Sequence, residues 1–194
     1  MTALRCEAKP LIQHFGLRDE AHHNDFRIYS NHSTRLVISG VGKIAAATAT
    51  AYLQETSEDQ GDGVWLNIGV AGHLSKPMGE VFMAHKLTDA ASGHTIYPQL
   101  TFKPPCATEC LLTTDQPMTR LPPDTMVDME AFGFYSTAIH FANRERVHCL
   151  KIISDNGASL EDSLSAKQVE ALVQGAMETI TALTIPLEGL VERG

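Results

Sequence analysis

The stretch Leu150-Lys151-Ile152-Ile153-Ser154-Asp155-Asn156-Gly157-Ala158 decides the fold of this chain. Its first half is an apolar run of strand length, which stops at a Ser-Asp pair followed by small residues. This order predicts a buried strand over residues 147–154 with a carboxylic acid at its end. Open α/β sheets bind their ligands at the carboxyl ends of their strands. The stretch therefore places Asp155 where such a sheet would have its functional site.

Two other segments have the same build. Val127-Asp128-Met129-Glu130 leads into a helical pattern, and Asn67-Ile68-Gly69-Val70-Ala71-Gly72 follows the apolar run Val64-Trp65-Leu66. In each segment, small or acidic residues come directly after a strand signal. Because ligands gather at strand ends in this class of sheet, we expect the three segments to lie together.

Strand and helix patterns alternate along the whole sequence. Strands are predicted over residues 27–29, 35–39, 64–68, 80–87, 109–114, 125–127 and 147–154, and helices over 7–15, 43–55, 130–143 and 165–183. This alternation predicts the α/β class, as a three-layer α/β/α arrangement with a central mixed β-sheet. Ser163 or Ser165 is expected to cap the last helix. No linker, repeat or low-complexity stretch divides the chain, so we expect a single domain over residues 1–194.

The composition excludes several kinds of partner. The formal charge is −8 and the 15 Lys and Arg residues are scattered, which argues against a nucleic-acid-binding surface. No apolar run is long enough to span a bilayer and no secretory signal is evident, so we expect a cytoplasmic protein without membrane contact. The four cysteines have neither the spacing of a zinc site nor the density of a disulfide framework, and we expect reduced thiols and no metal.

These segments, together with Ser39-Gly40-Val41-Gly42-Lys43 and the early Glu7, resemble the purine and uridine nucleoside phosphorylases and nucleosidases. The resemblance is closest to the methylthioadenosine/S-adenosylhomocysteine nucleosidase branch and spans roughly residues 3–182. It implies a nucleoside phosphorylase/hydrolase-like fold that needs no cofactor and takes a small nucleoside as substrate. It also implies a homo-oligomer, most simply a dimer.

The resemblance assigns roles to five polar or site-lining residues. Asp155 matches the acid that protonates N7 of the departing purine, and Ser154 matches the residue that orients it. Glu7 matches the residue that activates the attacking water. Met129 and Glu130 match the pair that holds the ribose, with the Glu carboxylate accepting from the 2′- and 3′-hydroxyls. An apolar strand would also raise the pKa of an acid at its end, as a proton donor near neutral pH requires.

The remaining substrate contacts follow from the same resemblance. Val70, Ala71 and Gly72 match the stretch beside the base and sugar, and the glycines there are expected to form a tight turn. The purine is expected near Ile152 and near the segment 114–117, which contains Gln116, and Phe132 is a candidate stacking partner. An aromatic side chain on a helix is also a common core residue.

Water is the expected acceptor of the ribosyl group. Phosphorylases of this fold place an Arg just before the central Gly-rich segment and a Ser close after it, whereas this chain has Trp65-Leu66-Asn67-Ile68-Gly69-Val70-Ala71. Phosphorolysis remains the alternative, with Arg5 and Lys43 as the candidate phosphate ligands.

Each acidic residue also has a simpler structural interpretation. Asp155 could cap the turn that follows it, Glu130 or Asp128 could cap the next helix, and Glu7 could be a first-turn carboxylate that complements the helix dipole. The chain could then be a nucleoside-binding or structural relative without catalysis. Only four residues precede Arg5, so the first strand is expected to be shorter than in the family, which questions how firmly Glu7 is held. The joint presence of Glu7, Glu130 and Asp155 favours an enzyme, because a binding module needs neither the acid nor the base.

Overall fold

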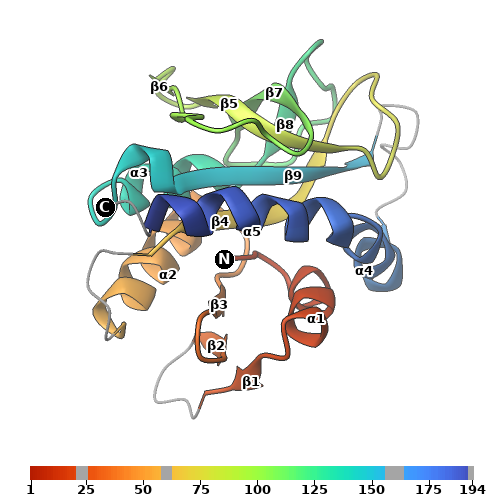
Figure 1. Ribbon diagram of the computed structural model, residues 1–194. Helices are drawn as coiled ribbons and strands as arrows, with labels where there is room; N and C mark the ends of the chain where they lie inside the picture. Colours follow the sequence, from red (N-terminus) through yellow and green to blue (C-terminus); the bar gives the residue numbers. More distant parts are fainter. Residues whose placement is uncertain (21–25, 58–62, 156–163, 192–194) are drawn as a thin grey trace.

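The computed structural model describes residues 1–20, 26–57, 63–155 and 164–191 (Figure 1). Ser163 and the segment 156–158 of the opening stretch lie outside them. The helices are α1 (Arg5–His14), α2 (Lys43–Glu55), α3 (Ala131–Ala138), the short 3-10 helix η1 (Arg144–Arg146), α4 (Ala166–Gly175) and α5 (Met177–Val191). The strands are β1 (Arg18–Asp19), β2 (Arg27–Ser30), β3 (Arg35–Ile38), β4 (Trp65–Gly72), β5 (Val81–Asp89), β6 (Thr95–Ile96), β7 (Ala107–Thr113), β8 (Met126–Asp128) and β9 (Val147–Asp155).

The central sheet is mixed, as predicted. Its six strands follow the order β6-β5-β7-β8-β4-β9, with parallel pairing in β5–β7, β7–β8 and β4–β9 and antiparallel pairing in β5–β6 and β4–β8. Strand β9 also pairs antiparallel with β5, so the sheet curls back on itself. Strands β4 and β9 therefore lie inside the sheet, and the ends of β4, β8 and β9 come together.

Helices cover both faces of this sheet. One hydrophobic cluster joins Cys149 and Ile153 of β9 to apolar residues of α2 and α3. The other joins Leu150 and Ile152 of the same strand to apolar residues of α1, α4 and α5. Side chains alternate between the two faces of a strand, and eight of the nine residues of β9 are buried. This confirms the predicted α/β/α layering, visible in Figure 1 as helices on two sides of the strands.

A separate three-stranded antiparallel sheet contains the predicted hairpin, in the order β1-β2-β3. The expected first strand is reduced to an isolated parallel bridge between Thr2 and Ile38. The Ile68 N–H donates to the Met1 carbonyl at 3.0 Å, and the Thr2 N–H donates to the Val37 carbonyl at 3.1 Å. Residues 1 and 2 thus connect the small sheet to β4, and the chain enters α1 directly from there.

Three predicted elements differ from the structure. The glycines expected to form a turn after residue 68 belong to β4, which continues to Gly72. The helix predicted over 130–143 ends at Ala138. The last predicted helix is two helices separated at Ala176, and Ser165 caps the first of them through a reciprocal bond with Gln168. Gly175 precedes the break, and glycine is a weak helix former.

No helix among the described residues is long and apolar enough to cross a bilayer.

Candidate functional site

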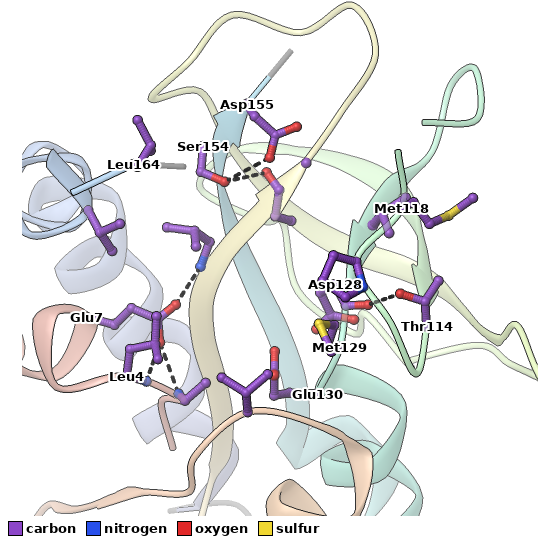
Figure 2. Close-up of a pocket in the computed structure, with 18 of the residues that line it drawn as sticks. Leu4, Glu7, Thr114, Met118, Asp128, Met129, Glu130, Ser154, Asp155 and Leu164 are labelled. Carbon is purple, nitrogen blue, oxygen red and sulfur yellow. Dashed lines mark hydrogen bonds between the residues drawn. The ribbon is translucent and has the colours of Figure 1, made fainter. Parts of the chain in front are cut away.

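A cavity of about 520 Å³ opens where β4, β8 and β9 end. This volume is within the usual range of small-molecule sites. Eight of the residues predicted for the site line the cavity: Glu7, Val70, Ala71, Gly72, Met129, Glu130, Ser154 and Asp155. Figure 2 shows Glu7 and Asp128–Glu130 on opposite sides of the strands, with Ser154 and Asp155 near the strand ends.

Glu7 is firmly held despite the missing first strand. Its Oε2 accepts hydrogen bonds from the backbone N–H groups of Ala3 and Leu4, at 3.0 and 2.8 Å. Its Oε1 accepts one from the N–H of Val70 on β4, at 2.9 Å. Only 2% of Glu7 is exposed. Three backbone donors from two parts of the chain therefore fix the carboxylate at the cavity wall, so the doubt about its rigidity is removed.

Asp155 owes its position to an irregularity in the pairing of β4 with β9. Ala71 is opposite Ile153, but the next residue, Gly72, is opposite Asp155. Ser154 is thus the extra residue of a β-bulge, a feature that redirects the side chains around it. The Ser154 hydroxyl lies 3.4 Å from Oδ2 of Asp155 and 3.3 Å from the carbonyl of Ala71.

Burial raises the pKa of Asp155, and the Ser154 hydroxyl opposes that rise. Oδ1 of Asp155 is buried and has no hydrogen-bond partner among the described residues. An aspartic acid in this environment holds its proton to higher pH than an exposed one.

Asp128, not Glu130, caps helix α3. Oδ2 of Asp128 accepts from the Ala131 N–H at 2.8 Å, and its Oδ1 accepts from the Thr113 hydroxyl at 2.7 Å. The Glu130 side chain makes no capping bond. Its Oε1 instead accepts from the N–H of Gly42 at 2.8 Å. The capping interpretation of Glu130 is therefore wrong, and its carboxylate faces the cavity.

A buried lysine lies beneath these carboxylates. Nζ of Lys151 is 2.9 Å from Oδ2 of Asp128, and each side chain is only 1% exposed. Desolvation lowers the pKa of Lys151, but the charges of Asp128 and Glu130 outweigh it and hold that pKa above its usual value. Burial raises the pKa of Glu130, while Lys151 and the Gly42 N–H oppose the rise. Lys151 thus offsets part of the negative charge around the cavity.

Three predicted contacts are not among the described residues that line the cavity. Ile152 packs in the cluster formed with α1, α4 and α5, because the side-chain alternation of β9 turns it toward those helices. Phe132 is 9% exposed in the other cluster, where its ring contacts that of His94 edge-on, so the core interpretation of this aromatic residue holds. Gln116 is exposed and its carbonyl accepts from the Thr114 hydroxyl, whereas Thr114 and Pro117 of the same predicted segment do line the cavity.

Sequence reasoning missed most of the apolar wall. Leu4, Val41, Met118, Leu121, Leu164 and Val169 line the cavity alongside the predicted residues. Val41 could have been predicted from the sequence, because an apolar residue between two glycines indicates an exposed position in a tight turn. The φ angles of Gly40 and Gly42 are 82° and 104°, and this left-handed backbone exposes 53% of Val41. The others come from loops and helices whose approach to the cavity is a matter of tertiary packing.

Lys43, one of the two candidate phosphate ligands, is already paired. Its Nζ contacts the carboxylate of Asp89 and lies 2.9 Å from Oδ1 of Asp115. Neither Lys43 nor Arg5 is among the residues that line the cavity. The described lining residues therefore offer no cationic side chain to an anion.

Replacing Ser154 with Ala should raise the pKa of Asp155 further. The hydroxyl lowers the pKa of Asp155 by stabilising the charged carboxylate, so its loss raises that pKa. If Asp155 must be protonated to act, the alkaline limb of the kcat profile moves to higher pH. Rate measurements between pH 5 and pH 10 would show the shift, and an unchanged or acid-shifted limb would contradict it.

Comparison with solved structures identifies the fold. The chain is similar to the 5′-methylthioadenosine/S-adenosylhomocysteine nucleosidase of Helicobacter pylori, with a TM-score of 0.73, 16% identity and 96% of each chain covered. It is also similar to the 5′-methylthioadenosine nucleosidase of Arabidopsis thaliana, with a TM-score of 0.74, 18% identity, and 97% of this chain and 94% of that chain covered. The futalosine hydrolase of Helicobacter pylori is similar at a TM-score of 0.71, 16% identity and 96% of each chain.

No protein-family model and no curated protein sequence matches this chain. The similarity is therefore one of three-dimensional structure, and it extends over nearly the whole length of both chains in each comparison. The predicted fold class is confirmed: this chain has the α/β fold of the methylthioadenosine/S-adenosylhomocysteine nucleosidases.

Proposed function

We propose that this protein hydrolyses the N-glycosidic bond of a purine nucleoside. The observation that carries the proposal is the convergence of Glu7, Glu130 and Asp155 on one cavity from three separate parts of the chain. The similar structures include nucleosidases for methylthioadenosine and S-adenosylhomocysteine and a futalosine hydrolase. Cleavage of such a bond needs an acid for the leaving group and a base for water, as in other glycoside hydrolysis.

The three carboxyl groups have environments that suit different tasks. Burial raises the pKa of Asp155, which suits it to act as the acid. It donates its proton to N7 of the purine as the bond between C1′ and N9 breaks. Glu7, fixed by three backbone N–H groups, accepts a proton from the water that attacks C1′. Because Asp128 caps helix α3, the Glu130 carboxylate can accept hydrogen bonds from the ribose hydroxyls. The products are the free base and the free ribose derivative.

The cavity lining favours a neutral, apolar group at the 5′ position. Leu4 donates its N–H to Glu7, Val41 precedes Gly42, whose N–H binds Glu130, and both Leu4 and Val41 line the cavity. No lysine or arginine is among the described lining residues, whereas Asp128 adds a further carboxylate. An anionic 5′ substituent would therefore find carboxylates but no cationic side chain among the described lining residues. A thioether such as the 5′-methylthio group suits this wall best.

The alternative of phosphorolysis has less support. Asp89 and Asp115 hold Lys43, and the segment 65–71 has no Arg where phosphorylases of this fold have one. Phosphate would also enter among carboxylates, where its charge is disfavoured. Water carries no such penalty.

A free-base assay tests the proposal. Purified protein is incubated with 5′-methylthioadenosine, S-adenosylhomocysteine, adenosine and inosine, each with and without phosphate, and the products are separated chromatographically. We expect release of adenine, fastest from 5′-methylthioadenosine, at a rate that phosphate does not change. A ribose 1-phosphate product would instead establish phosphorolysis, and binding without any base release would establish a nucleoside-binding relative.

The resemblance also leads us to propose a homo-oligomer, most simply a dimer. Three exposed apolar side chains support it: Leu4 and Val41 at the cavity, and Ile44 on the first turn of α2, which is 85% exposed. Water contact with such a group of side chains is unfavourable, and association of two copies would remove it.

A further inference from the structure

Strand β4 contains two glycines that its backbone conformation does not require. Among the described residues, the glycines with positive φ are Gly16, Gly40, Gly42, Gly79 and Gly93. Gly69 and Gly72 are not in this group, so other residues could adopt their backbone angles without strain. Glycine also weakens a strand interior, and it often marks a place where another group approaches the backbone closely.

The group that approaches Gly69 is the carboxylate of Glu7. A Cβ atom at position 69 would lie 2.9 Å from Oε1 and 3.4 Å from Cδ of Glu7. Real Cβ atoms essentially never come closer than 3.0 Å to such an atom. The same Oε1 accepts the hydrogen bond from the Val70 N–H, so the contact that fixes Glu7 on β4 depends on the missing side chain.

At Gly72 the approaching group is the carboxylate of Asp155. A Cβ atom there would lie 2.8 Å from Oδ1, 3.1 Å from Oδ2 and 3.2 Å from Cγ of Asp155. The bulge at Ser154 brings Asp155 opposite Gly72. A regular register would instead place Ser154 there. The bulge and the glycine therefore act together to lay the carboxylate over the β4 backbone.

Gly133 shows how a purely structural glycine differs. A Cβ atom at that position would lie 2.2 Å from the backbone oxygen of Lys43, at the contact between α3 and α2. Relief of that clash would require a helix to move. At Gly69 and Gly72 the atoms in the way are ends of side chains, which can turn aside while the sheet stays in place.

We propose that Gly69 and Gly72 are positioning residues, one for each half of the reaction. Gly69 gives the base Glu7 access to the cavity, and Gly72 does the same for the acid Asp155. This inference rests on the proposed function, because the tasks of the two carboxyl groups are those of a nucleosidase. A side chain at either position displaces one carboxyl group and leaves the other untouched.

Four double-mutant cycles test the proposal. Single-turnover cleavage is measured for Gly69→Ala and Gly72→Ala in the wild type, and for each again in the Glu7→Gln and Asp155→Asn backgrounds. Displacement of a reacting group by about 1 Å costs up to about 100-fold in rate, so we expect losses of about 10- to 100-fold for each glycine variant in the wild type. Gly69→Ala should lose its effect in Glu7→Gln and keep it in Asp155→Asn, and Gly72→Ala should do the reverse.

Two controls separate positioning from general damage. Gly175→Ala introduces a methyl group with nothing within 4 Å and should cleave at the wild-type rate. Calorimetric titration with a non-cleavable nucleoside should give the same affinity for Gly69→Ala and wild type, because the base acts only on the attacking water.

The outcomes distinguish a failure of the proposed function from a failure of the positioning roles of Gly69 and Gly72. If Glu7→Gln and Asp155→Asn abolish cleavage but both glycine variants cleave like wild type, the proposed function stands and the positioning roles are wrong. If each glycine variant loses activity equally in both backgrounds, the glycines serve the fold alone and the inference is again wrong. If wild type releases no base, the proposed function fails and the inference fails with it.

Discussion

Replacing Asp155 with Asn should leave the fold intact and lower cleavage by about 10²–10⁴-fold, the usual contribution of general acid catalysis. The amide has nearly the shape of the acid but cannot transfer a proton to the leaving purine. Burial raises the pKa of the Asp155 carboxyl group, which favours its neutral form. The neutral amide that replaces it therefore introduces no buried charge. Steady-state release of adenine from 5′-methylthioadenosine, compared with a thermal melt of the same variant, measures both effects.

Asp19→Asn is a matched control for this variant. Asp19 is an exposed aspartate of β1, in the small sheet away from the cavity, and the same chemical change there should leave kcat unaltered. Turnover of Asp155→Asn within a few-fold of wild type would remove Asp155 from the mechanism. A large drop in melting temperature would instead assign Asp155 a structural task.

Lys151→Met should destabilise the protein by about 3–5 kcal/mol, the usual cost of removing one partner of a buried ion pair. The side chains of Lys151 and Asp128 are each only 1% exposed, and their charged atoms are 2.9 Å apart. Without the ammonium, the Asp128 carboxylate keeps the Thr113 hydroxyl and the Ala131 N–H but loses its counter-charge. Denaturant-induced unfolding followed by circular dichroism measures the free energy of unfolding.

Two further variants show whether the charge is responsible. In the double variant Lys151→Met with Asp128→Asn the buried negative charge is gone, so the loss should be smaller than in Lys151→Met alone. Lys9→Met breaks the ion pair between Lys9 and Glu170, whose side chains are 55% and 30% exposed, and should cost less than about 1 kcal/mol. A change below 1 kcal/mol for Lys151→Met would show that the buried pair adds nothing to stability.

Glu130, Ser154 and Asp155 could be predicted because they follow or end strand signals, whereas Glu7 was identified through the family resemblance. Apolar runs before Gly69, Asp128 and Asp155 mark strands, and ligands of α/β sheets gather at strand ends. Ile152, Phe132 and Gln116 are not among the described residues that line the cavity, although Thr114 and Pro117 of the same predicted segment are, and their contact with a purine stays a prediction. In a strand, neighbouring residues point to opposite faces, so a residue beside a site residue commonly belongs to the core.

The sequence by itself determined the α/β class, the mixed sheet and which carboxyl groups stand at strand ends, because hydrophobic periodicity and the residues that interrupt it are local properties. Tertiary structure decided which carboxylate caps α3 and which faces the cavity, since Asp128 and Glu130 differ through the distant partners Lys151 and Gly42. It also decided that Gly69 and Gly72 lie within a strand against two carboxylates. Those contacts depend on the register between β4 and β9, which hydrogen bonds between residues some 80 positions apart establish and which no local pattern encodes.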